Sequence, residues 1–246
     1  MESREIAAPT RSGLQVALDV IIAPKAAFAS LREVPTWGWA LLIAVVLTGI
    51  GSYFCSPAFT HAFATEMPAK MAKQLANSTL TAEQREKQIA AVTAMTQTGA
   101  KFGFLFVMIL VPIVALIQSV ILLIANAITK GDGTFKKFWA LSLNIAVVGY
   151  GLSYIALMII VLIRGPESYN SSAAIAGSIP SFAILVPGAE GKLLAFLSGL
   201  NVFYIWATVL FALGLTIVAR IPRTAAIVTA VIMLLGGAGM AALGQQ

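Results

Sequence analysis

The chain has 246 residues, of which 59% are hydrophobic and only 11% are charged, and its formal net charge is +6. Soluble domains contain roughly 45–50% apolar and about 25% charged residues, so this composition excludes a water-soluble enzyme and a disordered segment. The single cysteine, Cys55, excludes a disulfide-stapled secreted module. The composition is typical of a polytopic membrane protein.

Residues 1–36 are predicted to form an amphipathic leader that lies on the membrane surface. Pro24 is expected to divide it into two short helices, the second beginning near Lys25. Such a pair of helices could cap one end of a bundle, or it could dock a partner or sense curvature, and the sequence leaves both readings open. The apolar residues that recur at helical spacing are Leu14, Leu18, Ile21, Phe28 and Leu31.

Five long apolar runs follow the leader, and none of them contains Asp, Glu, Lys, Arg or His. Roughly 20 helical residues are needed to cross a hydrocarbon core of about 30 Å, so each run is long enough to cross. We therefore predict an all-α fold, a bundle of five transmembrane helices over residues 37–243 with a short C-terminal end at 244–246. The predicted spans are 37–54, 102–128, 138–163, 193–219 and 225–243.

The segment 55–101 is predicted to be an extracytoplasmic helical hairpin. Its first arm has an apolar residue at every fourth position, and Pro68 is expected to kink or interrupt that arm. Thr81 followed by Gln84 resembles a capping box that opens the second arm. The stripe could serve packing or a partner, and packing is the simpler interpretation. It consists of Phe59, Phe63, Met67, Met71 and Leu75.

Two further connectors have distinct compositions. The segment 129–137 is short and basic, with Gly131 and Gly133 expected to permit a turn of positive φ, and it is either a plain connector or a recognition loop. The apolar segment 181–186 is too short to cross a bilayer, so we expect it to be interfacial or re-entrant.

Polar side chains within the spans are neutral. They are expected to hold the bundle together through interhelical hydrogen bonds, or alternatively to line a path for a neutral solute. Stripes of small residues, Ala44–Thr48–Ser52 and Gly237–Ala241, are expected to allow close helix approach within the chain or in a homo-oligomer. The side chains of the possible path are Gln118, Asn126, Asn144 and Asn201.

Chemistry that needs charge or metal ligands finds no support in the sequence. The only histidine, His61, is expected at the surface, and no residue set indicates a catalytic, cofactor or metal site. Basic residues are denser in the leader and in the connectors on its side, which predicts a cytoplasmic N-terminus and an extracytoplasmic C-terminus. They do not form one soluble basic face, so no nucleic acid partner is expected.

Two short motifs give the chain a family resemblance. The leader segment 22–31, followed by Pro35-Thr-Trp37, and the connector 131–136 resemble the Yip domain family of Ypt/Rab-interacting membrane proteins. The resemblance implies a non-enzymatic protein with five spans, the N-terminus inside and the C-terminus outside. Eukaryotic relatives bind prenylated Rab-type GTPases, whereas bacterial relatives are mostly of unknown function. The chain lacks the Asp-Leu-Tyr-Gly-Pro stretch of eukaryotic members, which argues against GTPase binding and favours a bacterial inner-membrane member. It also departs from the family pattern in having Gly151 where many members have proline after Tyr150.

Two functional hypotheses follow. The first is a membrane scaffold or interaction protein that contacts protein partners, or itself, through the cytoplasmic leader and the 129–137 connector. The second is a permease or channel for a neutral or lipid-like solute, lined by the four path residues given above. The residues expected to contact a partner are Pro24, Phe28, Leu31, Gly131, Asp132, Gly133 and Phe135.

Overall fold

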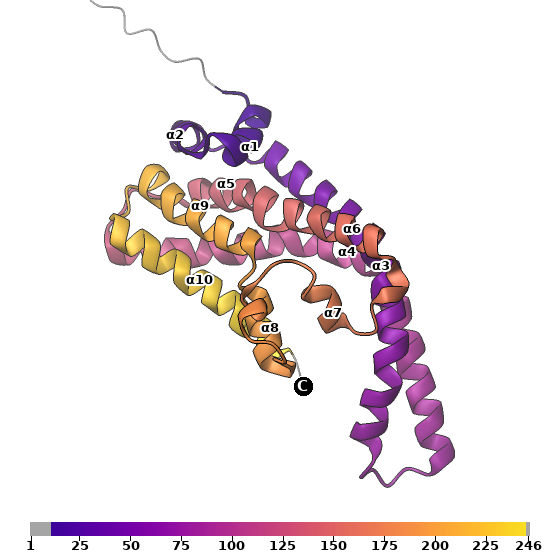
Figure 1. Ribbon diagram of the computed structural model, residues 1–246. Coiled ribbons are helices and arrows are strands. Elements are labelled where there is room, and N and C mark those ends of the chain that lie inside the picture. Colours follow the sequence, from indigo (N-terminus) through magenta and orange to yellow (C-terminus); the bar gives the residue numbers. More distant parts are fainter. Residues whose placement is uncertain (1–10, 245–246) are drawn as a thin grey trace, which may run out of the picture.

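A computed structural model describes residues 11–244, and within that range the chain is built from helices without any β-strand (Figure 1). The predicted all-α fold is therefore confirmed. Four helical segments are long and apolar enough to cross a membrane: α3 (Gly38–Leu75), α4 (Ala82–Thr129), the segment Phe135–Arg164 and α10 (Arg223–Leu243). The shorter apolar helix α9 (Val202–Val218) has 17 residues, at the lower limit of the length needed to span. The chain is an integral, multi-pass membrane protein.

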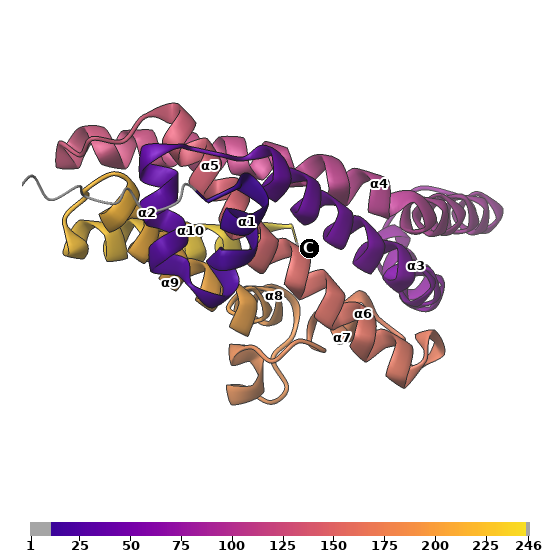
Figure 2. The same ribbon diagram turned by 90° about the horizontal axis from the view of Figure 1, so that it is seen from above.

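The leader forms two helices, α1 (Gly13–Ile22) and α2 (Pro24–Glu33), as the break predicted at Pro24 requires. Pro24 occupies the first turn of α2, where its missing N–H leaves no hydrogen bond unmade. Both helices lie over one side of the bundle, above α5 (Phe135–Ala146) and α9 in Figure 1, and α2 packs against both of these helices (Figures 1 and 2).

The buried face of α1 differs from the predicted stripe. Val16, Ala17 and Val20 are fully buried, whereas Leu14 and Leu18 are exposed. The reason is that α1 is apolar around most of its circumference, so spacing alone does not select the face that packs. In α2 the prediction holds, since Phe28 and Leu31 are fully buried.

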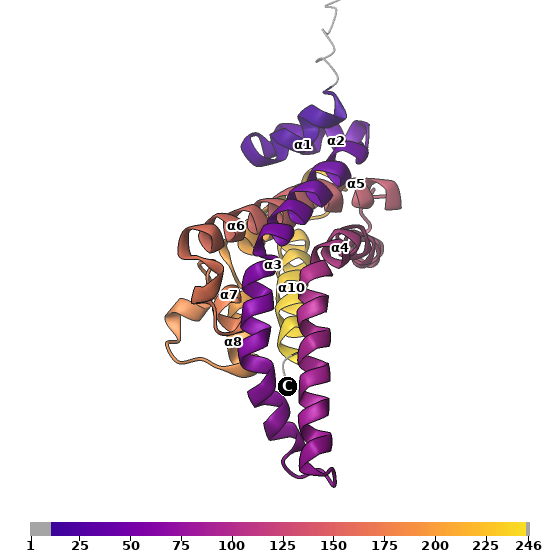
Figure 3. The ribbon, with the colours of Figure 1, turned by 90° about the vertical axis from the view of Figure 1, so that its right-hand side faces the viewer.

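The segment 55–101 is a helical hairpin, but its arms are not separate helices. The first arm continues α3 from the first predicted span, and the second arm continues through α4 into the second. Pro57 and Pro68 lie inside α3 without ending it. Beyond the bundle the two helices leave together as a projecting pair (Figures 1 and 3). The predicted capping box is present, with the Gln84 amide donating to Thr81 Oγ1 at 3.3 Å.

The predicted span 193–219 is not one helix. It is divided into α8 (Gly191–Gly199) and α9, with the break at Leu200 and Asn201. Asn201 caps α9 at the break, because its Oδ1 accepts hydrogen bonds from the amides of Phe203 and Tyr204. The change of direction lets α8 pack against α10 (Figure 1).

The segment Phe135–Arg164 consists of α5, a π-helical turn (Val147–Leu152) and α6 (Ser153–Arg164). Gly149 and Gly151 lie in the π-turn, where Gly151 lets Leu47 of α3 approach closely. The remaining short elements lie between α6 and α8: η2 (Pro166–Ser168), α7 (Ser172–Ala176) and η3 (Phe182–Leu185). Phe182, Ile184, Leu185 and Val186 are exposed around η3.

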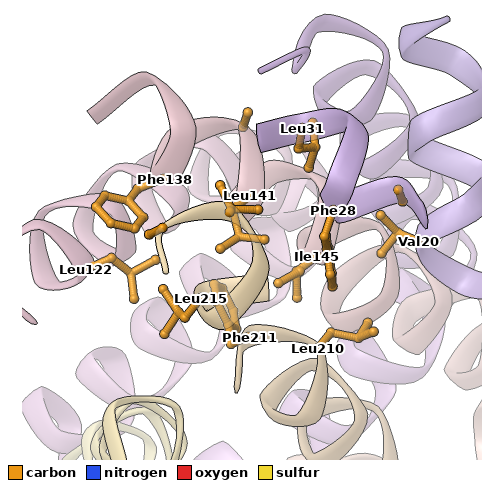
Figure 4. Close-up of a cluster of buried hydrophobic side chains, with 14 of the residues drawn as sticks. Val20, Phe28, Leu31, Leu122, Phe138, Leu141, Ile145, Leu210, Phe211 and Leu215 are labelled. Carbon is orange, nitrogen blue, oxygen red and sulfur yellow. The ribbon is translucent and has the colours of Figure 1, made fainter. Parts of the chain in front are cut away.

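The largest buried cluster joins the leader to the bundle. Side chains from α1, α2, α4, α5 and α9 meet there, so the leader is anchored by core packing (Figure 4). Fully burying one such side chain stabilises by about 1.5–3 kcal/mol in water-soluble proteins. The labelled members are Val20, Phe28, Leu31, Leu122, Phe138, Leu141, Ile145, Leu210, Phe211 and Leu215.

Candidate functional site

Three segments meet where the C-terminal end of α2 reaches one end of the bundle, and we call this region the leader face. It consists of α2, the α4–α5 connector (130–134) and the α9–α10 connector (219–222). All three belong to regions of the chain where the sequence places basic residues near the membrane surface.

Asn126, one turn before the end of α4, folds the 130–134 connector back onto that helix. Its Oδ1 accepts a hydrogen bond from the Gly133 amide at 2.9 Å, and its Nδ2 donates to the Gly133 carbonyl at 3.3 Å. The Gly131 amide donates to the Asn126 carbonyl at 3.1 Å. One residue, through its side chain and its backbone carbonyl, therefore binds both Gly133 and Gly131 of the turn.

The expected positive φ of the connector is at a different residue. Lys130 has φ of 54° and ends α4 in the left-handed conformation, whereas Gly131 and Gly133 do not have positive φ. Glycine is needed at these two positions for another reason, because a side chain there would collide with neighbouring atoms. A Cβ on Gly131 would lie 2.7 Å from the Ala219 carbonyl oxygen, and one on Gly133 would overlap the Phe138 ring.

Asp132 connects the three segments of the leader face. Its amide donates to the Ala219 carbonyl at 2.9 Å, and its carboxylate lies 3.4 Å from Arg220 Nε and 3.9 Å from Arg32 Nη2. The Asp132 side chain is 43% exposed, so each ion pair contributes little by itself, typically about 0–1 kcal/mol. The backbone bond and the two ion pairs together set the position of the connector.

A row of aromatic rings borders this cluster. Phe135 stacks on Trp139 at 6.2 Å between ring centroids, and Trp37 meets Trp139 edge-on at the same distance. Phe135 is 43% exposed and Trp37 is 40% exposed. This aromatic row, Trp37–Trp139–Phe135, joins the start of α3 to the start of α5. Tryptophan is common at membrane interfaces, where its ring is apolar and its N–H can stay hydrated.

The residues expected to contact a partner occupy different environments. Phe28 and Leu31 are fully buried in the core, so they do not offer a surface, because the apolar stripe of α2 packs inward. Pro24, Gly131 and Gly133 are partly buried and shape the backbone. Asp132 and Phe135 are exposed on the leader face.

The sequence reasoning missed Arg32 and Arg220 as partners of Asp132. Each is a basic residue at the membrane boundary. The tendency of basic residues to collect on one side of a membrane already accounts for their positions, so the sequence alone did not indicate ion pairs. The signal that was available is that Asp132 is the only acidic residue in either of the two connectors, 130–134 and 219–222.

The four predicted path residues do not hydrogen-bond to one another within residues 11–244. Asn126 holds the connector, and Asn201 caps α9. Asn144 Nδ2 donates to the carbonyls of Ala140 at 2.8 Å and Thr36 at 3.0 Å, which ties α5 to the segment before α3. Gln118 is partly buried in α4.

The other end of the bundle has its own polar contacts. His61, expected at the surface, is partly buried, with Nδ1 at 3.1 Å from the Tyr169 carbonyl oxygen. The Ser172 hydroxyl donates to Glu66 at 2.9 Å, and Lys70 pairs with the same carboxylate at 3.2 Å. These contacts fix the base of the hairpin to the loop after α6. No group of three potential metal ligands occurs in the described range 11–244.

The sequence was compared with known proteins. A sequence profile of the Yip1 domain matches residues 18–243. The chain is also similar to the membrane protein YknW of Bacillus subtilis strain 168, with 28% identity over 216 residues that cover 87% of this chain and 83% of that protein. No solved structure is significantly similar. The resemblance predicted from the leader and connector motifs is confirmed.

Proposed function

The chain belongs to the Yip1 domain family, and on that premise we propose that it is a non-enzymatic membrane interaction protein whose leader face binds a protein partner. The observation that supports this most directly is the exposure of Phe135 close to Asp132, next to a connector whose backbone is held by Asn126 on one side and by Ala219 on the other. A fixed backbone that presents an aromatic ring and a charge loses little entropy on binding.

The proposal places the leader face in the cytoplasm of a bacterium whose inner membrane contains the protein, in keeping with the basic residues near that face. Self-association belongs to the same proposal. Gly237 and Ala241 of α10 are on the outer side of the bundle, and a Cβ added to Gly237 would meet no neighbour within 4 Å.

The alternative hypothesis, a neutral-solute permease, has weaker support. Three of its four lining side chains, Asn126, Asn144 and Asn201, already hydrogen-bond to backbone atoms in their own neighbourhood. Side chains that are committed to backbone groups are poor candidates for solute ligands, because each solute contact would leave a backbone group unpaired.

The test uses crosslinking in native membranes, followed by affinity purification through an N-terminal tag and mass spectrometry. We compare the wild type with Phe135→Ala and with the matched control Phe182→Ala. Phe182 is similarly exposed, at 48% against 43%, and lies in η3, away from the leader face. We expect a stoichiometric partner with the wild type and the control that is lost with Phe135→Ala. Retention of every partner by Phe135→Ala contradicts the proposed surface.

A further inference from the structure

An apolar groove of about 320 Å³ runs between α4 and α10. Its walls are branched aliphatic side chains that the rest of the bundle leaves exposed, with Ile124 and Ile128 on α4 and Val228 and Ile232 on α10. Two hydroxyls, those of Thr129 and Thr229, are the polar groups in its lining.

The groove reaches the leader face. Thr129 is the last residue of α4, and the lining on α10 begins two residues after the start of that helix. The end of α4 and the start of α10 lie at the same end of the bundle (Figure 1), where Asp132 bonds to the carbonyl of Ala219. From Ala225 to Ile232 the groove therefore extends about 10 Å along α10, at 1.5 Å per residue.

Two basic residues flank the lining of this groove in the chain, at its end near the leader face, which we call its mouth. Lys130 directly follows Thr129, and Arg223 is the first residue of α10. Both residues are exposed, and neither forms an ion pair within residues 11–244. The nearest acidic residue in the connectors, Asp132, is already shared by Arg32 and Arg220. The mouth therefore carries positive charge that the described part of the protein does not neutralise.

We propose that the groove is a binding site for an anionic phospholipid of the leaflet at the leader face. One acyl chain occupies the apolar groove, and the phosphate lies between Lys130 and Arg223. Thr229 makes no side-chain hydrogen bond within the described range. It lies about 9 Å along α10 from Arg223, so its hydroxyl can donate to an ester carbonyl of the lipid below the headgroup. The side-chain hydroxyl of Thr129 is already used, because it donates to the Ala125 carbonyl at 2.8 Å.

Charge complementarity favours a lipid over a second copy of the chain. A symmetric dimer through this groove would bring the Lys130 and Arg223 side chains of two chains together, and like charges in proximity oppose association. An anionic headgroup instead supplies the missing negative charge. A zwitterionic phospholipid fills the groove equally well but gains less at its mouth.

Native mass spectrometry of the purified full-length protein tests the site, with phosphatidylglycerol and phosphatidylcholine of identical acyl chains as probes. We expect the wild type to bind phosphatidylglycerol about 30-fold more tightly, which corresponds to about 2 kcal/mol for two basic side chains at a membrane surface. The double variant Lys130→Gln/Arg223→Gln is expected to bind both lipids equally. Val228→Trp fills the groove and is expected to weaken binding of both lipids.

The matched control is Lys73→Gln/Lys101→Gln, which removes the same charge from exposed positions on the hairpin helices and should keep the wild-type preference. Three results overturn the proposal. They are a wild type without preference for the anionic lipid, a preference that survives in Lys130→Gln/Arg223→Gln, and a dimer from which Val228→Trp removes the second chain rather than lipid. Melting temperatures of all variants within a few degrees of the wild type show that the substitutions act on binding.

Discussion

Asn126 illustrates how a polar side chain in an apolar helix acts on the backbone. A neutral amide near the end of a span can meet another helix, a solute or a turn, and here it binds both the amide and the carbonyl of Gly133. On folding, the Asn126 amide and the Gly133 backbone exchange their hydrogen bonds to water for two hydrogen bonds with each other. The site is partly buried, where an unpaired polar group would lower the stability of the fold. Asn126 therefore holds the connector from the side of α4, as Asp132 holds it from the side of the 219–222 connector.

Replacing Asn126 with leucine should destabilise the protein by about 1–3 kcal/mol, because the Gly133 amide and carbonyl lose their partners. The measurement is thermal unfolding of the purified protein in detergent. Gln118→Leu is the matched control, since Gln118 makes no hydrogen bond within residues 11–244 and should unfold at the wild-type temperature. Equal losses in the two variants would contradict the role given to Asn126.

At the scale of elements, a helix boundary could be predicted from the sequence where the residues next to it determine it. Pro24 divides the leader, and Thr81 with Gln84 starts α4, because a proline ring and a capping box act on the residues next to them. These boundaries could be predicted without knowledge of any other helix.

Boundaries that depend on distant packing could not be predicted. The break before Asn201 lies inside an uninterrupted apolar run, and it is compensated by α8 packing on α10, where a Cβ on Gly199 would lie 2.9 Å from Ala238 Cα. For the same reason the ion pairs of Asp132 with Arg32 and Arg220 join residues far apart in the chain, and no local pattern connects them. Phe135, expected to contact a partner, is exposed at the start of α5, whereas Phe28, expected to do the same, is buried by tertiary packing.

The crossing of α3 and α6 gives a prediction at this scale. A Cβ on Gly51 would lie 2.6 Å from the backbone carbonyl of Tyr154, and backbone atoms cannot move aside cheaply. Gly51→Ala should therefore destabilise the protein by about 1–3 kcal/mol, as overpacking does in other close-packed interiors. Gly103→Ala in α4 has no neighbour within 4 Å and should leave stability unchanged or raise it by about 0.5–1 kcal/mol. Thermal unfolding distinguishes them, and a loss in Gly103→Ala as large as in Gly51→Ala would refute the steric explanation.

At the scale of the whole molecule, the two ends of the bundle are built differently. The leader face is closed by two helices packed into the core and by connectors tied through Asp132. The opposite end carries the projecting hairpin, whose base is fixed by Glu66 to Ser172, and the exposed apolar segment around η3. The connectors tied through Asp132 at the first end and the long helical projection at the second therefore give the two ends of the bundle unlike surfaces.

The orientation of this asymmetry can be measured with single cysteines, because the natural Cys55 is fully buried. We expect Asn77→Cys, at the exposed turn of the hairpin, to react with a membrane-impermeant maleimide in spheroplasts, whose outer envelope is removed and whose inner membrane is intact. Lys25→Cys, exposed on α2, should react only after the membrane is permeabilised. The expectation rests on the excess of basic residues near the leader face, since positively charged loops are retained in the cytoplasm. The opposite labelling pattern would place the leader face outside, and a protein partner would then have to be sought on that side of the membrane.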